Sequence, residues 1–398
     1  MTRDSIMNRP SRAGAAPRKV AAWLTLFGIV LLALNLRAAI TGLAPLLPDV
    51  RSDLKLSGAM AGFLTSLPLL CFGLLSPLAA LLGRRVGVER ALLLAMLGIV
   101  VGSLVRTVAG AGWMVAGTAV IGGAITVGNV LLPSVVKQDF PERQGVVTGL
   151  TAAAMTGGAA IAAVVAQPLA DAGLGWRGAL LGLGAFAAVA AAVWLPQARH
   201  RHPAPGLRLG GAVLRSPVTW QLAVFMAMQS MTFYAMLAWL PTLLRDNGVS
   251  AAGSGWALGL FNLLGIATAS VVPALAARRR DQRGLALVVC AAWAVGLAGL
   301  LLAVPLYPLW SALTGLAQGG GIALTLTLIV VRARTPDSAR ELSGTVQSVG
   351  YVLASAGPVA VGVLRDASGG WELPLAALGV AVAVMALAGV GAGRDRQV

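Results

Sequence analysis

Long apolar runs separated by short polar connections make up most of this chain. Twelve of these runs reach the roughly 20 residues that a helix needs to cross the hydrocarbon core of a bilayer. We expect them at residues 22–48, 57–82, 90–109, 112–136, 145–170, 176–195, 217–243, 253–277, 284–304, 308–331, 342–364 and 371–392. The pattern therefore predicts an all-α membrane protein with twelve transmembrane helices.

The polar stretches divide the twelve runs into two sets of six. The longest polar stretch after the N-terminal tail separates the sixth run from the seventh, and it is rich in Pro, Gly and Arg. It also holds both histidines of the chain, His200 and His202. We expect a cytoplasmic N-terminal tail at 1–21, six-helix halves at 22–195 and 217–392, a cytoplasmic linker at 196–216 and a C-terminal tail at 393–398.

Rare residues recur between the two sets at a nearly constant offset. An offset of 195 places Pro141 on Pro336, Asp171 on Asp366 and Trp176 on Trp371, and an offset of 196 places Pro45 on Pro241 and Pro77 on Pro273. Parallel repeats related by an axis along the membrane normal are typical of transporters that bind solute near the midplane between two halves. The repeat therefore predicts two six-helix halves with pseudo-two-fold symmetry.

Composition and charge agree with a membrane protein. The chain is 58% hydrophobic and 11% charged, with a mean hydropathy of +0.83, which excludes an ordinary soluble domain. With a cytoplasmic N-terminus, 23 of the 30 basic residues lie on the cytoplasmic side. The other side holds Arg51, Lys55, Arg106, Arg177, Arg245 and Arg365. The positive-inside rule therefore places both termini in the cytoplasm, and the net charge of +16 does not indicate a nucleic-acid partner.

Arg37 is the remaining basic residue, and it lies near the middle of the first apolar run. A charge at the centre of a span costs about 2.5–3.5 kcal/mol on insertion scales and usually marks a functional site. All 14 acidic residues lie in tails, in connections or at span ends. The nearest of them, Asp49, is expected to be a solvated charge at the end of the first span. The sequence therefore offers Arg37 no obvious counter-ion.

Three explanations for Arg37 stay open. An anionic solute could neutralise it through the bidentate hydrogen bonds that a guanidinium forms with planar oxyanions. Alternatively, backbone carbonyls, water or chloride could hold it in a polar cavity that binds a neutral solute. Third, the side chain could be structural and reach towards a membrane surface, although each end of the span lies about 15 Å away at 1.5 Å per residue.

Neutral polar residues at mid-span could complete a solute site. Thr41 lies one helical turn after Arg37 and shares its face, whereas Asn35 lies on the other side of the helix among small residues, where packing is slightly favoured over ligand binding. The other candidates could either face a cavity or bond to a neighbouring helix. The predicted substrate-binding residues are Arg37, Thr41, Asn35, Gln229, Tyr234, Asn262, Gln347, Tyr351 and Asn129.

The residues that carry most enzyme chemistry are scattered. The acids are spread over many connections and the histidines lie in the linker, so we expect no catalytic residue, no metal site, no cofactor and no enzyme activity. Because no carboxylate or imidazole lies at the midplane to relay protons, we expect uniport, exchange, or movement with a proton carried by the solute. A membrane sensor that binds solute without moving it stays open as an alternative.

The whole chain resembles the major facilitator superfamily, with its twelve spans, basic central linker and basic turns after spans two and eight. The superfamily carries a Gly-x-x-x-Asp-Arg-x-Gly motif after span two; here Arg85 and Gly87 match it, but Arg84 stands at the position of the acid. More narrowly, the segments NLRAA at 35–39 and PLLP at 45–48 are similar to the first span of the cyanate and 2-nitroimidazole porter family.

The resemblance implies a secondary or facilitative transporter that works by alternating access, as a monomer, in a bacterial inner membrane. It implies a small anion such as cyanate, which we expect Arg37 to hold, or a small neutral heteroaromatic compound such as 2-nitroimidazole. The direction of transport and the coupling ion stay open. The expected partners are the solute and the lipid bilayer.

Overall fold

The structure is a computed structural model, and it describes residues 15–199 and 213–398. Most of the predicted N-terminal tail, the centre of the predicted linker and both histidines lie outside the described residues. The first half contains α1 (Ala15–Thr41), α2 (Leu43–Leu54), α3 (Gly58–Val86), α4 (Val88–Arg106), α5 (Ala111–Asp139), α6 (Gln144–Leu169) and α7 (Gly175–Trp194). The second half contains α8 (Pro217–Asp246), α9 (Ala251–Ala277), α10 (Arg283–Leu302), α11 (Tyr307–Arg332), α12 (Pro336–Ala354), α13 (Ala356–Ser368) and α14 (Glu372–Ala392).

Twelve spans account for these helices, as the hydrophobic pattern predicts. By length and hydropathy, eleven segments of the described chain could cross a membrane, and the longest of them, Val146–Trp194, has 49 residues and includes both α6 and α7. A π-helical turn at Ala170–Leu174 separates the two helices, and Gly173 within it has a φ of 95°, which is not helical. Because α6 and α7 also pack against each other, this segment is two spans.

Two of the twelve spans are broken rather than continuous. The first consists of α1 and α2, which meet at Gly42, and the eleventh consists of α12 and α13, which meet at Ser355. Pro45 lies in the first turn of α2 and has no backbone N–H, so it cannot donate the helical hydrogen bond to Thr41 four residues earlier. The break in the first span lies one turn after Arg37.

Local signals explain where several helices begin. The hydroxyls of Ser57 and Ser250 accept hydrogen bonds from backbone N–H groups in the first turns of α3 and α9. Thr335 and Ser338 form a reciprocal capping box at the start of α12. Such side chains satisfy N–H groups that have no partner within the helix.

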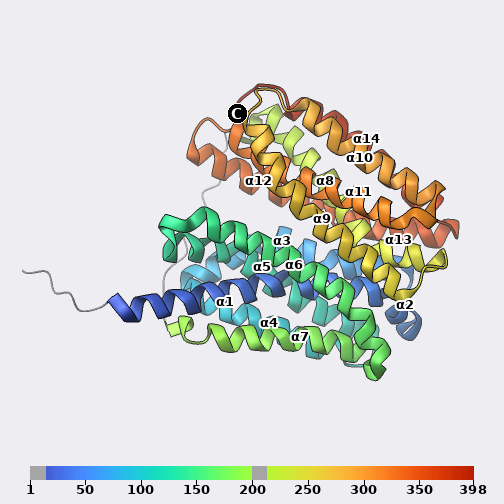
Figure 1. Ribbon diagram of the computed structural model, residues 1–398, viewed down its shortest axis with the longest axis horizontal. Coiled ribbons are helices and arrows are strands. Elements are labelled where there is room, and N and C mark those ends of the chain that lie inside the picture. The colour runs from blue at the N-terminus through green and yellow to red at the C-terminus, as the bar shows by residue number, and fades with distance from the viewer. Residues whose placement is uncertain (1–14, 200–212) are drawn as a thin grey trace, which may run out of the picture.

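The same packing pattern occurs in both halves. The first span of each half packs against the fifth and sixth, as α1 does on α6 and α7 and α8 does on α12 and α14. The fourth span packs against the second and third, as α5 does on α3 and α4 and α11 does on α9 and α10. Figure 1 shows the two halves as two adjoining groups of helices, one coloured blue to green and the other yellow-green to red. This correspondence agrees with the predicted pseudo-two-fold symmetry.

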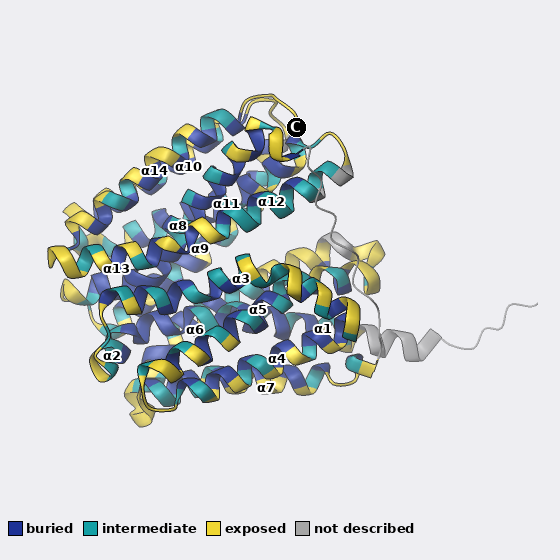
Figure 2. Cartoon of the chain, turned by 180° about the vertical axis from the view of Figure 1, so that it is seen from behind, coloured by how far each residue is buried: buried dark blue, intermediate teal, exposed yellow. Residues whose placement is uncertain are grey.

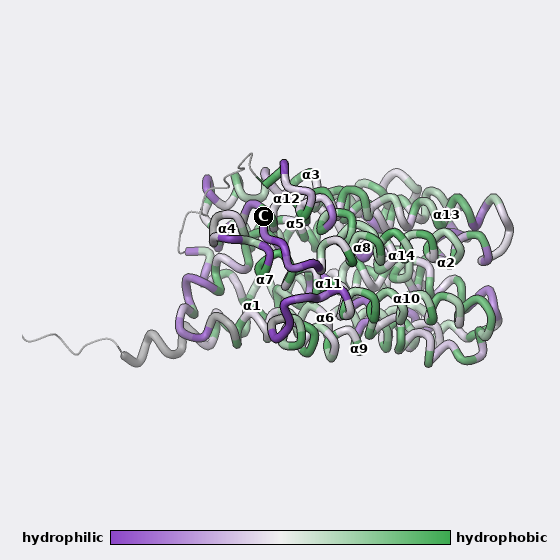
Figure 3. The backbone as a smooth tube through the Cα atoms, turned by 90° about the horizontal axis from the view of Figure 1, so that it is seen from above, coloured by the Kyte–Doolittle hydropathy of each residue, from purple (hydrophilic) through white to green (hydrophobic). Residues whose placement is uncertain are grey.

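The halves meet along two symmetry-related helix contacts. In one contact α3 packs against α12 and α13, and in the other α6 packs against α9. Buried residues lie inside each half and along these contacts, while exposed residues lie on the outer faces (Figure 2). Hydrophobic residues prevail along the helices and hydrophilic ones gather at the helix ends and in the connections (Figure 3).

One end of the bundle carries most of the described basic residues. The helices α3, α5, α11 and α14 all finish there, and they bring Arg84, Arg85, Lys137, Arg332 and Arg394 to it. We call this the basic end. At the opposite end α2 is followed by α3.

Candidate functional site

A cavity of about 760 Å³ lies between the two halves, lined by residues of α1, α6, α8, α9, α11 and α12. Its volume falls within the range of about 300–1,000 Å³ that is usual for small-molecule sites. Its lining runs from Asn262 and Gln318 in the middle of the bundle to Pro273 and Val331 near the ends of α9 and α11. The cavity therefore extends from the middle of the bundle to the basic end.

Arg37 projects from α1 into this cavity. Its Nη1 donates a hydrogen bond to the hydroxyl of Tyr234, with 3.2 Å between the two atoms. Its guanidinium carbon lies 5.8 Å from the ring centre of Phe233 and 6.0 Å from that of Tyr234, which is cation–π distance. Among the described residues no carboxylate pairs with it. Since a guanidinium has five N–H donors, Arg37 retains donors for a solute.

Aromatic side chains form a row beside Arg37. Phe72 of α3 meets Tyr351 of α12 at 4.7 Å between ring centres, and Tyr351 lies 6.4 Å from Tyr234 of α8. The row continues from Tyr234 to Phe233 at 4.7 Å and from Phe233 to Phe261 of α9 at 5.8 Å. We call these five residues the aromatic row. It joins the two halves next to the charge of Arg37.

The structure brings six of the nine predicted site residues together. Those that line the cavity are Arg37, Gln229, Tyr234, Asn262, Gln347 and Tyr351. Asn35, Thr41 and Asn129 are not among the lining residues. Asn35 is 1% exposed and donates to the backbone oxygen of Leu31 in its own helix, as expected from its position on the side of α1 away from Arg37. Thr41 is buried where α1 ends.

Gln229 already has protein partners at both ends of its amide. Its Nε2 donates to the backbone oxygen of Gln318, and its Oε1 accepts from the indole N–H of Trp293, both at 3.0 Å. It is 1% exposed and packs over Gly321, where a Cβ would collide with it. Gln229 therefore joins α8, α10 and α11 at the cavity wall.

Asn262 and Gln347 line the cavity, and each uses its amide nitrogen for a hydrogen bond within its own helix. The Asn262 nitrogen donates to the backbone oxygen of Leu258 at 2.8 Å, and the Gln347 nitrogen donates to the hydroxyl of Ser343 at 2.7 Å. Because both nitrogens are engaged within their own helices, the carbonyl oxygen is the group that each side chain can offer to a solute.

Two residues near the site could not be singled out from the sequence. Phe233 lines the cavity, but a phenylalanine in an apolar span gives no signal except its place beside Tyr234. Arg106 falls near the end of the predicted span at 90–109, but its burial could not be foreseen: it lies in the last turn of α4 and is 2% exposed. Its Nε donates to the Thr118 hydroxyl at 3.1 Å and its Nη1 to the backbone oxygen of Ala39 at 3.3 Å.

The contact between Arg106 and Ala39 supports the end of α1. Carbonyls in the last turn of a helix lack helical donors, and a cation is favoured there by the helix dipole. Ala39 lies in the last turn of α1, two residues after Arg37. Arg106 is therefore placed to fix the part of α1 that presents Arg37.

Replacing Arg106 with methionine is expected to weaken solute binding about tenfold, because a hydrogen bond to a charged group contributes about 1.5–3 kcal/mol. The measurement is the dissociation constant in the wild-type and Arg37→Lys backgrounds. If Arg106 acts through Arg37, the loss should be smaller in the Arg37→Lys background. An equal loss in both backgrounds would show that Arg106 affects the site by another route.

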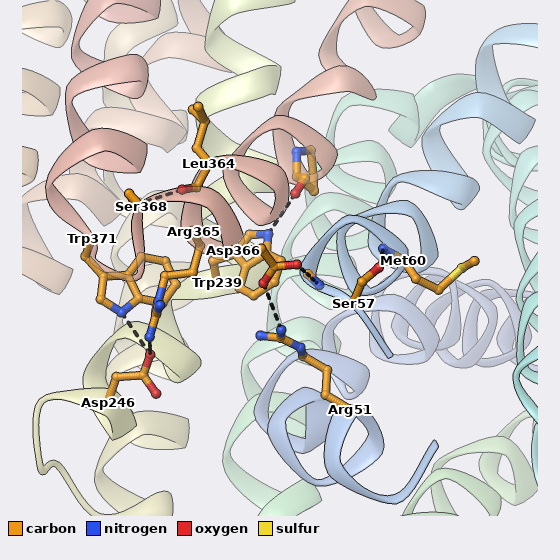
Figure 4. A network of polar contacts seen from close by, with 12 residues as sticks. Arg51, Ser57, Met60, Trp239, Asp246, Leu364, Arg365, Asp366, Ser368 and Trp371 are labelled. Carbon is orange, nitrogen blue, oxygen red and sulfur yellow. Dashed lines mark hydrogen bonds and ion pairs between the residues drawn. The ribbon is translucent and has the colours of Figure 1, made fainter. Parts of the chain in front are cut away.

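Ion pairs between the halves close the opposite end of the bundle. Arg51 of α2 pairs with Asp366 of α13 at 3.1 Å, and Asp366 also accepts from the backbone N–H of Gly58 (Figure 4). Asp49 of α2 pairs with Arg245 of α8 at 3.1 Å. Asp49 is thus held by the other half instead of being solvated as expected. The repeat places Asp49 and Arg245 at equivalent positions, so this pair joins corresponding sites of the two halves.

Small residues bring the backbones of the two halves into contact at this end. Gly58 and Gly62 on α3 face Gly362 and Pro358 on α13, and a Cβ on Gly62 would collide with the backbone oxygen of Pro358. Side-chain-free surfaces of this kind let helices approach closely. The two halves are therefore packed together at the opposite end and enclose a cavity towards the basic end.

Acidic and histidine residues do not gather into a metal site in the part of the chain that the structure describes. No group of three or more His, Cys, Asp or Glu side chains there could hold a metal ion. The cavity offers one guanidinium, two phenols, aliphatic hydroxyls, amides and aromatic faces, which suit the binding of a small solute.

Comparisons with known proteins agree with this architecture. The family model described as "Major Facilitator Superfamily" matches residues 25–358. The "2-nitroimidazole transporter" of Escherichia coli is 41% identical over 377 residues, which is 93% of this chain and 95% of that protein. The "Uncharacterized transporter YycB" of Bacillus subtilis is 40% identical over 386 residues, 96% of each. The "Cyanate transport protein CynX" of Escherichia coli is 31% identical over 351 residues, 86% of this chain and 90% of that protein.

Solved structures with the same fold are also transporters. The nucleoside transporter NupG matches with a TM-score of 0.77 and 11% identity, over 92% of this chain and 99% of that one. A D-xylose-proton symporter matches with a TM-score of 0.73 and 12% identity, over 93% and 96% of the two chains. These matches confirm the fold class, and the relatives confirm the resemblance to cyanate and 2-nitroimidazole porters. The chain belongs to the major facilitator superfamily and is a multi-pass membrane transporter, not an enzyme.

Proposed function

We propose that this transporter moves a small anion and that Arg37 is the residue that binds it. The observation that carries the proposal is a guanidinium that faces a cavity between the halves and pairs with no carboxylate among the described residues. An uncompensated charge in a membrane interior is costly, and a solute carboxylate or similar oxyanion compensates it through paired, charge-assisted hydrogen bonds. Tyr234, Tyr351, Asn262 and Gln347 orient the solute from the other half.

The proposed cycle is alternating access between the two halves. The positive-inside rule favours a cytoplasmic basic end, in the inner membrane of a bacterium. With that orientation, the cavity faces the cytoplasm and the ion pairs of Arg51 and Arg245 close the outer side. Transport then requires the outer contacts to part while the basic end closes around the solute. The protein acts as a monomer by uniport or exchange.

A neutral heteroaromatic solute is the second candidate. The aromatic row favours it, since flat rings pack well against aromatic side chains. One relative at 41% identity is a 2-nitroimidazole transporter, whereas the cyanate transport protein is 31% identical. In this alternative Arg37 is held by Tyr234, the aromatic faces and water, and solute affinity does not depend on its charge.

Counterflow in proteoliposomes tests the proposal. Vesicles containing the purified protein are preloaded with unlabelled solute and diluted into labelled solute, with cyanate, benzoate and 2-nitroimidazole as probes. A carrier accumulates label transiently above equilibrium, which passive leak cannot do. The proposal predicts such an overshoot for at least one anion. An overshoot with 2-nitroimidazole alone would favour the neutral candidate. The lack of an overshoot with both cyanate and benzoate would contradict the proposal.

A further inference from the structure

We infer that the solute of this site is a flat aromatic anion, whose charge lies on Arg37 and whose ring lies against the aromatic row. This inference rests on the proposed function, because it requires Arg37 to bind an anion. It is narrower, since it distinguishes aromatic carboxylates from both a triatomic anion such as cyanate and an uncharged ring.

Aromatic side chains lie directly beside the Arg37 guanidinium. Phe233 and Tyr234 lie 5.8 and 6.0 Å from the guanidinium carbon, and the Tyr234 hydroxyl bonds to it. An oxyanion bound to the remaining N–H groups therefore has aromatic faces and edges directly beside it. Whatever group is attached to that oxyanion must pack against these rings.

The rings of the aromatic row lie at distances typical of favourable aromatic pairs. The centres of neighbouring rings in the aromatic row are 4.7–6.4 Å apart, in edge-to-face or stacked geometry. Aromatic pairs prefer centre distances of about 4.5–7 Å, and an added ring gains from such contacts beyond its apolar area. Tyr234 and Tyr351 both line the cavity, so a solute ring next to Arg37 can join the row.

Beyond Arg37 the wall of the cavity is largely apolar and includes Met155, Ile322, Leu326 and Val330. A triatomic anion would occupy a small part of the 760 Å³ and leave these side chains in contact with water. An anion with a ring removes apolar surface from water as well as neutralising Arg37. The cavity therefore fits a larger, amphipathic anion better than an inorganic one.

Equilibrium binding to the full-length protein in detergent, followed by thermal shift and by intrinsic tryptophan fluorescence, tests the inference. Four probes separate charge from aromaticity: benzoate, cyclohexanecarboxylate, benzamide and cyanate. Benzoate is expected to bind at least tenfold more tightly than benzamide and cyanate, because each of them lacks one of the two contacts. The expected preference for benzoate over cyclohexanecarboxylate is about two- to tenfold, as aromatic pairs suggest.

A pair of matched variants then locates the aromatic contact. Phe233→Leu is expected to weaken benzoate binding more than cyclohexanecarboxylate binding, so that the preference for benzoate falls about two- to tenfold. Phe186 on α7 is 40% exposed and is not among the cavity-lining residues, so Phe186→Leu is expected to change neither. Melting temperatures without ligand show whether each variant is folded.

The results distinguish failure of this inference from failure of the proposed function. Equal affinities for benzoate, cyclohexanecarboxylate and cyanate, all lost in Arg37→Ala, would overturn the inference and leave an anion site. Equal affinities for benzoate and benzamide, unchanged in Arg37→Ala, would overturn the proposed function together with the inference.

Discussion

Arg37→Ala is expected to lower anion transport at least about thirtyfold, because removing one partner of a buried, hydrogen-bonded charge pair costs about 2–5 kcal/mol. Arg37→Lys keeps the charge but loses the planar fork that binds an oxyanion through two parallel hydrogen bonds. We expect it to retain partial activity, about tenfold below wild type. The measurement is the initial rate of labelled anion uptake by proteoliposomes of equal protein content.

The stability of the Arg37→Ala variant is a second readout of the same prediction. Since Arg37 pairs with no carboxylate in the described part of the chain, its removal is expected to leave the melting temperature unchanged or higher. Arg177 serves as the matched control, because it pairs with Asp53 at 2.8 Å, is 36% exposed and lies outside the cavity lining. Arg177→Ala should transport normally. Wild-type transport by both Arg37 variants would refute an essential role for this side chain.

Gly62→Val is expected to hold the halves apart at the opposite end of the bundle. Gly62 faces the backbone of Pro358, and its missing Cβ is what permits this contact. Overpacking of a tight contact costs about 1–3 kcal/mol, so the ratio of open to closed forms at this end should rise about fivefold to 150-fold. Net transport should fall, because the cycle requires this end to close.

Labelling of a reporter cysteine measures the change in the ratio of open to closed forms. Ser66 lies one turn after Gly62 on α3 and is fully buried, and the two native cysteines, Cys71 and Cys290, are buried as well. In a Ser66→Cys background, Gly62→Val should increase labelling by a membrane-impermeant thiol reagent. Gly149 on α6 has open space around its Cβ position, so Gly149→Val is the matched control. Unchanged labelling of a folded Gly62→Val protein would contradict the closure described above.

The sequence predicts the number of spans because each apolar run is long enough to cross a bilayer, whatever the helices pack against. It does not predict that the first and eleventh spans are broken. Each break lies three residues before a proline, Pro45 or Pro358. Because the continuous helix α3 also contains prolines, a proline in an apolar run does not by itself predict a break. Arg106 shows the same restriction. A basic residue near the end of an apolar run can face solvent or be buried against neighbouring helices, and only packing decides between them.

The candidate site, like the fold, could be predicted from the sequence only in part. The position of Arg37 follows from its place in the first span, and helix geometry correctly separates it from Asn35. Thr41 shares the expected face of Arg37 but is buried outside the cavity lining, because α1 ends there. The protein partners of Gln229 and the pairing of Asp49 with Arg245 arise between segments far apart in the chain. Such contacts leave no pattern in a single sequence.

Equilibrium binding of anions to wild type and to Arg37→Ala tests most directly whether a solute anion neutralises the charge of Arg37. Titration calorimetry of cyanate and benzoate gives both affinities without depending on the transport cycle. We predict saturable binding of at least one anion to wild type and none to Arg37→Ala at the same concentrations. Equal affinities in the two proteins would contradict the account.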